Sequence, residues 1–360
     1  MTMRPRVLVT GDKGYIGSVL TGVLLERAYH VTGIDTAYYA DCLLEAAPPG
    51  YPSTTRDIRD VTGNDLRGVD AIVHLAALSN DPLGELAPGL TEQINLHATI
   101  RLARLAREAG VQRFVYSSSQ SMYGVANTEH ELDEDHSEKK AITAYARTKW
   151  EAELALKELA GPEFTVVCFR PSTVFGASPR LRCDIVYNSL VACAYTTGKI
   201  EIKSDGLPWR PVVHVRDACS AFVAGLEAPP ELVCGRSYNV GIANGNYSVR
   251  ELAEAAGRAV PGSVITYTGE HGSDARTYRV SFARILSELK DWYHPEWSLD
   301  RGGAELVEQF KRIDFTEAQF RGRATNRLSQ LKYLIESGRL DSHLRWSQAG
   351  TPDDLPSHEI

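Results

Sequence analysis

Tyr145 and Lys149 are the two residues whose types and spacing point most directly to chemistry. They stand four positions apart in a segment with helical character, so both side chains lie on one face of a helix, one turn apart. A phenol with an ordinary pKa near ~10 is a poor base at neutral pH, but a neighbouring ammonium group stabilises the phenolate and lowers that pKa. The pair can therefore do acid–base work. The alternative is a surface helix that carries the two residues at this spacing by chance.

A glycine-rich turn near the amino terminus indicates a dinucleotide site. A short apolar strand runs into a helix through Gly11, Gly14 and Gly17. The first glycine permits a tight turn, the second lets a pyrophosphate approach the backbone, and the third lets the helix pack on the strand. The helix N-terminus offers its N–H groups to the phosphates, and we place Tyr15 and Ile16 in the same site. An ordinary strand-to-helix turn is the alternative.

Asp35 strengthens this interpretation and selects the cofactor. It follows the second expected strand, residues 29–34, at roughly the distance from the glycines at which an acidic residue accepts both ribose hydroxyls. Because its carboxylate would repel a 2′-phosphate, the sequence predicts NAD rather than NADP as the cofactor.

Near-continuous apolar strands alternate with helical segments around these motifs. The strands are expected at residues 71–77, 113–116 and 164–170, and the helices at 18–27, 94–109 and 144–159. Such alternation predicts an α/β fold with a doubly wound parallel sheet, of the Rossmann type, covered on both faces. One strand ends in Ser117, Ser118 and Ser119, and in such a sheet that end points at the nicotinamide site. These hydroxyls favour a catalytic role for the tyrosine–lysine pair.

The second half of the chain has a different character, with short strands and helices between prolines and glycines. We expect residues 1–175 to form an NAD-binding Rossmann domain, to which a strand and helix at about 211–245 return. Residues 176–346 are expected to form a smaller, partly discontinuous substrate lobe with amphipathic C-terminal helices at about 303–344. Residues 347–360, with almost no apolar side chains, are expected to be a disordered tail.

Composition excludes several classes of protein. A net charge of −7 argues against general binding to nucleic acid or to an anionic membrane. No stretch approaches ~18 apolar residues and no signal-peptide core opens the chain, so we expect a cytoplasmic protein without a membrane segment. The six cysteines contain no C-x-x-C pair, and we expect no metal site.

A series of motifs occurs in one order between residue 7 and about residue 285. The series comprises Thr10-Gly11-x-x-Gly14-x-x-Gly17, Asp57-Ile58-Arg59-Asp60, His74-Leu75-Ala76-Ala77, Asn95, Ser117-Ser118-Ser119 with Tyr123-Gly124, Tyr145-x-x-x-Lys149, Arg170-Pro171, Trp209-Arg210-Pro211 with His214-Val215-x-Asp217, and Tyr238-Asn239-Val240-Gly241. The series resembles the extended short-chain dehydrogenase/reductase family, in particular its nucleotide-sugar epimerases and dehydratases, the branch typified by UDP-galactose 4-epimerase.

The resemblance implies a role for each matching residue. Tyr145 matches the active-site base, Lys149 the residue that lowers the pKa of that base and holds the nicotinamide ribose, and Ser119 the hydroxyl that binds the sugar oxygen being oxidised. The resemblance also implies further cofactor-binding residues, which we take to be Asp57, Ile58, Leu75, Ala76, Ala77 and Pro171. The substrate expected is a nucleoside-diphosphate sugar.

The same resemblance suggests how the substrate is held. Arg210 matches an arginine that clamps the nucleotide diphosphate, a task suited to a guanidinium fork, and Arg276 or Arg279 would supply a second clamp. A solvated surface charge is the alternative for each arginine. Gln120, Thr173 and Asn188 complete the expected substrate-binding residues.

Departures from the family pattern narrow the reaction. Nucleotide-sugar 4,6-dehydratases place Asp-Glu directly after the active-site hydroxyl residue, where this chain has Gln120 and Ser121. The decarboxylating branch has a glutamate, and the 3,5-epimerising branch a cysteine, at the position of Ser121. What remains is oxidation at C4 by Tyr145 and NAD, and rotation of the 4-ketosugar before its reduction makes a 4-epimerase. A C4 dehydrogenase or 4-ketoreductase, and a non-catalytic nicotinamide-binding protein, are the alternatives.

The sugar and the assembly state are less constrained. Thr173 replaces an asparagine that usually contacts the substrate, and residues 178–188 are more basic than in plain hexose epimerases, so a heptose, deoxy or acidic sugar is also compatible. The family implies a homodimer through a four-helix bundle built from the helices at 94–109 and 144–159. We expect its apolar seam to consist of Leu102, Leu105, Ala152 and Leu156.

Overall fold

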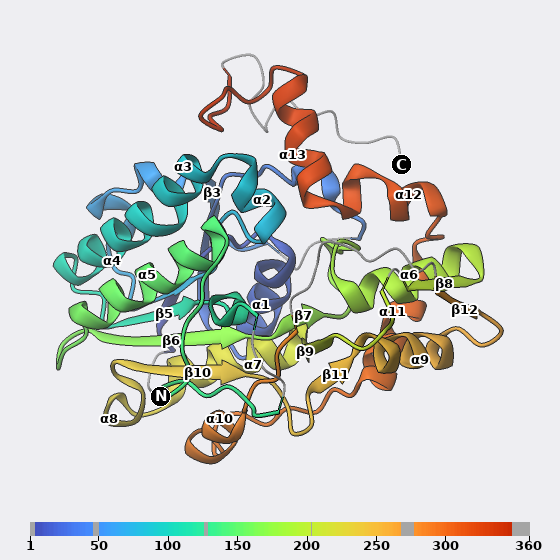
Figure 1. The fold of residues 1–360 in the computed structure, drawn as a ribbon. Helices are drawn as coiled ribbons and strands as arrows, with labels where there is room; N and C mark the ends of the chain where they lie inside the picture. The colour runs from blue at the N-terminus through green and yellow to red at the C-terminus, as the bar shows by residue number, and fades with distance from the viewer. Residues whose placement is uncertain (1–3, 46–49, 126–128, 203, 268–276, 348–360) are drawn as a thin grey trace.

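A seven-stranded parallel sheet forms the centre of the computed structural model (Figure 1), which describes residues 4–45, 50–125, 129–202, 204–267 and 277–347. The strand order is β10-β6-β5-β4-β1-β2-β3. These strands are β1 (Arg6–Thr10), β2 (His30–Asp35), β3 (Ser53–Thr55), β4 (Ala71–His74), β5 (Arg113–Ser117), β6 (Thr165–Pro171) and β10 (Arg236–Val240). From β1 the chain adds β2 and β3 on one side and then β4, β5 and β6 on the other, so the strand order switches between β1 and β4. Open α/β folds bind ligands at such a switch point.

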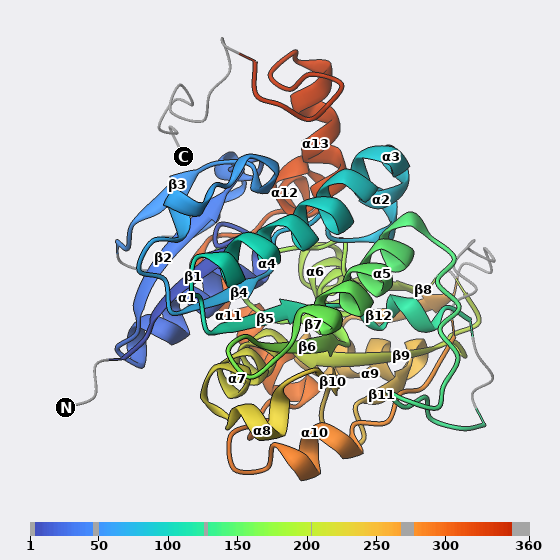
Figure 2. The ribbon, with the colours of Figure 1, turned by 90° about the vertical axis from the view of Figure 1, so that its left-hand side faces the viewer.

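Both faces of the sheet are buried, as β1 illustrates. Val7 and Val9 face a core shared with α1 (Tyr15–Glu26) and α7 (Val215–Glu227). Leu8 faces the opposite core, shared with α4 (Thr99–Glu108) and α5 (Ala144–Leu159). Figure 2 shows α4 and α5 on one side of the sheet and α7 on the other. The prediction of a doubly wound Rossmann sheet is confirmed.

Some expected elements begin or end elsewhere than predicted. The first helix begins at Tyr15 rather than at residue 18, because Gly14 is already its extended N-cap residue. The helix expected at 94–109 begins within a π-helical stretch, Glu92–Ala98, and becomes α-helical only at Thr99. Within this stretch the Asn95 amide accepts a hydrogen bond from the Leu78 N–H at 2.8 Å and donates one to the Leu78 carbonyl at 3.1 Å. Asn95 thus fixes the chain just beyond β4.

A second core lies beyond the carboxyl ends of the central strands. Its sheets pair β7 (Thr173–Phe175), β9 (Trp209–His214) and β11 (Asn246–Ser248), and separately β8 (Lys199–Ile202) with β12 (Val264–Tyr267). Three helices pack together there: α6 (Val186–Thr197), α9 (Val249–Ala259) and α11 (Leu299–Arg312). This smaller lobe is discontinuous, since β10 returns to the central sheet beside β6.

Short helices complete the chain. They are α2 (Asp81–Leu86), α3 (Pro88–Thr91), α8 (Pro230–Val233), α10 (Ala283–Glu288), α12 (Glu317–Arg321) and α13 (Arg327–Glu336). The amphipathic stretch expected at 303–344 thus consists of separate helices, and α13 contacts α2 across the top of the view in Figure 1. The tail expected at 347–360 lies outside the described residues apart from Ser347.

The expected dimer seam is largely wrong. Leu102, Ala152 and Leu156 are completely buried within one chain, in the core between α4, α5 and the sheet, and Leu105 is partly buried against the same core. They face inward because the two helices already use their apolar sides to cover the sheet. Any interface on these helices must therefore use their outer, more polar faces.

Candidate active site

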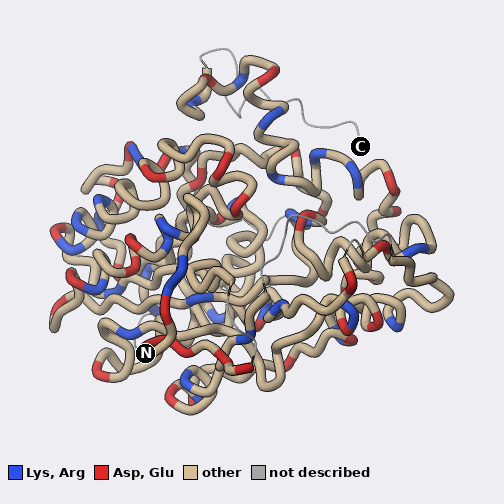
Figure 3. Tube along the Cα trace, in the orientation of Figure 1, with Lys and Arg blue, Asp and Glu red and all other residues tan. Residues whose placement is uncertain are grey.

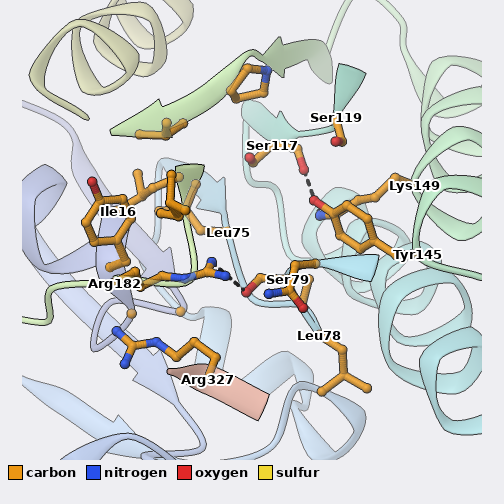
Figure 4. A pocket seen from close by; sticks show the side chains of 18 of the residues that line it. Ile16, Leu75, Leu78, Ser79, Ser117, Ser119, Tyr145, Lys149, Arg182 and Arg327 are labelled. Atoms are coloured by element: carbon orange, nitrogen blue, oxygen red, sulfur yellow. Dashed lines mark hydrogen bonds between the residues drawn. The ribbon is translucent and has the colours of Figure 1, made fainter. Parts of the chain in front are cut away.

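The predicted motifs converge on one pocket at the carboxyl ends of the parallel strands (Figure 4), with a volume of about 610 Å³. Most of the residues predicted for the site line it. They are Gly11, Gly14, Tyr15, Ile16, Gly17, Asp35, Asp57, Ile58, Leu75, Ala76, Ala77, Ser119, Gln120, Tyr145, Lys149, Pro171, Thr173 and Arg210. Asn188 is not among the lining residues, and Arg276 lies outside the described residues.

The glycine turn has the shape of a dinucleotide cradle. Gly11 has a φ of +75°, which side-chain-bearing residues rarely adopt, and a Cβ there would lie 2.8 Å from the Ala76 nitrogen. A Cβ on Gly17 would lie 2.0 Å from the Gly11 carbonyl oxygen. The first turn of α1 has N–H groups without partners in their own helix, as every helix does. The turn thus fits the diphosphate of a dinucleotide.

Asp35 is held at the end of β2 by backbone groups. Its carboxylate accepts hydrogen bonds from the Lys13 N–H at 3.1 Å and the Ala37 N–H at 2.7 Å. Burial raises the pKa of Asp35 above its ordinary value, and these bonds oppose the rise. Asp12 lies close by, and burial together with the Asp35 charge raises its pKa to about 6. The Asp35 carboxylate lines the pocket and makes this end of it unfavourable for a phosphate on the ribose.

Tyr145 and Ser119 meet on the opposite side of the pocket. The first turn of α5 carries Tyr145, and its N-cap residue Thr143 accepts a hydrogen bond from the Ala146 N–H. Burial raises the pKa of Tyr145 to about 12, and a hydrogen bond with Ser119 opposes this rise. Ser119 in turn donates a hydrogen bond to the Ser121 hydroxyl at 3.0 Å.

Lys149 is enclosed beside Ser117. Its ammonium group donates to the Ser117 carbonyl at 2.8 Å and lies 4.9 Å from the centre of the Tyr116 ring. Burial lowers the pKa of Lys149 to about 7, because its side chain is almost completely enclosed. Burial is also the largest influence on the pKa of Tyr145, which it raises.

The Gln120 side chain, which follows Ser119 in the chain, is buried. Its nitrogen donates to the Arg170 carbonyl at 3.0 Å, and its buried oxygen has no hydrogen-bond partner among the described residues. The side chain is 1% exposed, so this acceptor is enclosed by the chain although Gln120 lines the pocket.

The substrate side of the pocket differs in part from expectation. Arg210 on β9 lines it, as does Thr173 at the start of β7. The assignment of Asn188 is wrong: its amide is fully buried and bonds to the Gly176 N–H, the Tyr15 hydroxyl and the Arg182 carbonyl. It fixes the backbone instead of facing the pocket.

Arg276 and Arg279 were the two candidates for a second arginine that clamps the nucleotide diphosphate. Arg276 lies outside the described residues. Arg279 forms an ion pair with Glu131 at 3.1 Å and lies over the Trp209 ring, with 5.0 Å between the guanidinium carbon and the ring centre. Arg279 is not among the residues that line the pocket.

Two arginines that line the pocket were not predicted individually as site residues. Arg182 lies within the basic segment that the sequence singled out, where it forms two hydrogen bonds with Asp184 at 2.8 and 3.0 Å. Arg327 opens α13, far along the chain, and lines the pocket near Arg182 (Figure 4). The composition of residues 178–188 was a signal for the first, but no motif surrounds the second.

Two other properties of the described part of the chain concern its possible partners. No three of its His, Cys, Asp and Glu side chains are grouped as they would be around a metal ion. Its helices are all too short or too polar to cross a membrane.

Comparisons with known proteins agree with this geometry. The family model described as "NAD dependent epimerase/dehydratase family" matches residues 7–241. UDP-glucose 4-epimerase from Bacillus subtilis (strain 168) is 28% identical over 340 residues, covering 83% of this chain and 94% of that protein. Among solved structures, MoeE5 in complex with UDP-glucose and NAD has a TM-score of 0.71 and 26% identity, covering 85% of this chain and 99% of that chain.

A 4,6-dehydratase is equally similar. DesIV, a dTDP-glucose 4,6-dehydratase from Streptomyces venezuelae solved with NAD bound, has a TM-score of 0.73 and 26% identity, covering 87% of this chain and 99% of that chain. The expected cofactor, NAD, and the resemblance to nucleotide-sugar enzymes of the extended short-chain dehydrogenase/reductase type are confirmed. The chain therefore belongs to the NAD dependent epimerase/dehydratase family.

Proposed function

We propose that this protein is a nucleotide-sugar 4-epimerase that oxidises C4 of its substrate transiently. One observation carries the proposal: Ser119, Tyr145 and Lys149 line the same pocket as the dinucleotide turn, while the two positions after Ser119 hold Gln120 and Ser121. Loss of water across C5 and C6 needs an acid and a base. An amide and a hydroxyl at those positions supply neither, which leaves chemistry at C4 alone.

The chain's own residues would hold and move one proton. Tyr145 takes the proton of the C4 hydroxyl through its phenol oxygen, while Ser119 donates a hydrogen bond to the same sugar oxygen. NAD, when bound, supplies the hydride acceptor and a positively charged ring. Since burial raises the pKa of Tyr145 to about 12, the positive charges of that ring and of Lys149 would have to lower it for the phenol to act as a base near neutral pH.

The second half of the reaction reverses the first. After C4 loses its hydrogen, the 4-ketosugar turns over in the pocket and exposes its other face. Tyr145 would return the proton to the C4 oxygen while C4 regains, on its other face, the hydride that the coenzyme accepted in the first half, so the configuration at C4 would be inverted. Arg210 holds the nucleotide diphosphate during this rotation, so that the intermediate is not released.

The experiment is incubation with nucleotide sugars such as UDP-glucose, dTDP-glucose and UDP-glucuronic acid, followed by proton NMR and absorbance. The proposal predicts the C4 epimer of one of these sugars without net formation of reduced nicotinamide. Stoichiometric reduced nicotinamide would instead identify a C4 dehydrogenase. A 4-keto-6-deoxy product would identify a dehydratase, contrary to the proposal.

We further propose a homodimer through α4 and α5. These helices lie side by side on one flank of the molecule, and Figure 3 shows positive and negative residues interspersed along them. Leu154 on the outer face of α5 is 44% exposed, which supports an interface there in place of the buried seam. Light scattering at micromolar concentration should give twice the chain mass of 39.6 kDa, and a monomeric mass would refute the dimer.

A further inference from the structure

The pocket has a wall that the family match does not include. Residues 326–328, at the start of α13, line it, although the family model ends at residue 241. Arg327 contributes its guanidinium group to this wall and is only 2% exposed. The wall lies on the side of the pocket that holds Ile16 of the glycine turn, and Ser119 and Tyr145 lie across the pocket from it (Figure 4).

The charges around Arg327 do not balance. Its guanidinium group donates to the Arg180 carbonyl at 2.6 Å and lies 4.5 Å from the centre of the Tyr39 ring. Asp184 is the nearby carboxylate, but it is already engaged by both nitrogens of the Arg182 fork. Arg327 forms no ion pair with any carboxylate in the described part of the chain. Two buried positive charges thus share one negative charge.

Arg180 is a third buried arginine beside this pair. It donates to the backbone carbonyls of Tyr39 and Ala40, and the Asp35 carboxylate partly balances its charge, so the excess centres on Arg327. An unpaired charge held away from water costs several kcal/mol. The cluster is therefore built for an anion that arrives from outside the chain. Guanidinium forks match phosphate oxygens in geometry as well as in charge.

The position of the cluster indicates which phosphate it binds. Arg327 lies on the same side of the pocket as Ile16 of the glycine turn (Figure 4), whereas Arg210 lines the pocket from β9 in the smaller lobe. We propose that Arg327, with Arg182 beside it, binds the diphosphate of NAD. The C-terminal segment, residues 326–346, is then a structural part of the coenzyme site. This inference rests on NAD binding and not on the epimerase activity.

Contacts along the rest of the segment hold it over the same side of the site. Gln330 donates to the Tyr38 carbonyl at 3.0 Å, and the Tyr38 hydroxyl donates to the Leu344 carbonyl. The Trp346 indole donates to the Thr36 carbonyl at 2.7 Å. Thr36 and Tyr38 belong to the loop that follows Asp35 at the end of β2. These bonds therefore fix the segment that contains Arg327 against the ribose-binding end of the pocket.

The test compares ligand affinities of the coenzyme-stripped, full-length chain by calorimetry. Arg327→Gln should weaken NAD and ADP-ribose by about 10–100-fold, since a hydrogen bond to a charged group contributes about 1.5–3 kcal/mol. Adenosine, which has no phosphate, should bind as to the wild type. Lys332→Gln removes the same charge from an exposed position of α13, and it should leave all three affinities unchanged.

Two further measurements separate the alternatives. Arg327→Lys keeps the charge but loses the fork, so it should bind NAD with intermediate affinity, and it provides the test if the glutamine variant fails to fold. UDP tests the substrate's diphosphate as the other source of phosphate. Wild-type affinity for NAD in either Arg327 variant, an equal loss for adenosine, or a loss confined to UDP would overturn the proposal. None of these outcomes depends on whether the enzyme epimerises a sugar.

Discussion

Replacing Tyr145 by phenylalanine should lower turnover by about 10²–10⁴-fold while leaving NAD binding close to normal. The phenyl ring keeps the packing of the tyrosine at the start of α5, and only the hydroxyl that takes the C4 proton is lost. Lys149→Ala should damage both turnover and NAD binding, because it also removes the group expected to hold the nicotinamide ribose. Steady-state rates and calorimetric titration with NAD measure the two effects separately.

Gln120→Ala is the control for this experiment. Gln120 lines the same pocket, but the proposed reaction needs no acid or base at its position. Its loss should therefore reduce turnover far less than the loss of the Tyr145 hydroxyl. Near wild-type rates in Tyr145→Phe, or an equal loss in both variants, would remove Tyr145 from the proposed role.

Glu153→Ala should produce the largest loss of stability, about 3–5 kcal/mol in the free energy of unfolding. The Glu153 carboxylate is fully buried and accepts hydrogen bonds from Arg170 at 2.6 and 3.1 Å, as well as from the hydroxyls of Ser118 and Ser237. Its removal leaves the Arg170 guanidinium buried and uncompensated. Urea denaturation monitored by circular dichroism measures the change.

Glu151→Ala provides the matched control, since Glu151 lies on the same helix and its only described ion pair, with Arg147 at 3.8 Å, is largely exposed. It should cost less than about 1 kcal/mol. Burial alone would raise the pKa of Glu153, but Arg170 and the hydroxyls outweigh it and lower that pKa. The stabilisation is thus present above the ordinary glutamate pKa and lost as the pH falls below it. Equal losses in the two variants, or no loss in acid that depends on Glu153, would contradict this account.

The sequence predicted best what depends on short-range spacing. The three glycines, the strand ending in Ser119, and the helical turn between Tyr145 and Lys149 are each local patterns, and the parallel sheet brings their ends together. The bounds expected for the helix at 144–159 are likewise those of α5 in the structure.

What the sequence could not predict depends on tertiary packing. Arg327 reaches the pocket from a position 145 residues after Arg182, and no local pattern records that approach. The hydrogen bond from the Lys149 ammonium group to the Ser117 carbonyl depends on how β5 and α5 pack together. The sequence pattern of apolar residues such as Leu102 and Leu156 is the same whether they pack in the core or form an interface. Only the folded structure shows that these two lie in the core.

The most direct test of the central claim follows a deuterium atom placed at C4 of the accepted nucleotide sugar. If C4 is oxidised and then reduced within one enzyme complex, the epimer with inverted C4 should retain the deuterium at C4. Mass spectrometry and NMR of the product in ordinary water measure this retention. Deuterium that is lost to water, or that leaves the enzyme on released coenzyme, would contradict transient oxidation at C4 and with it the assignment as a 4-epimerase.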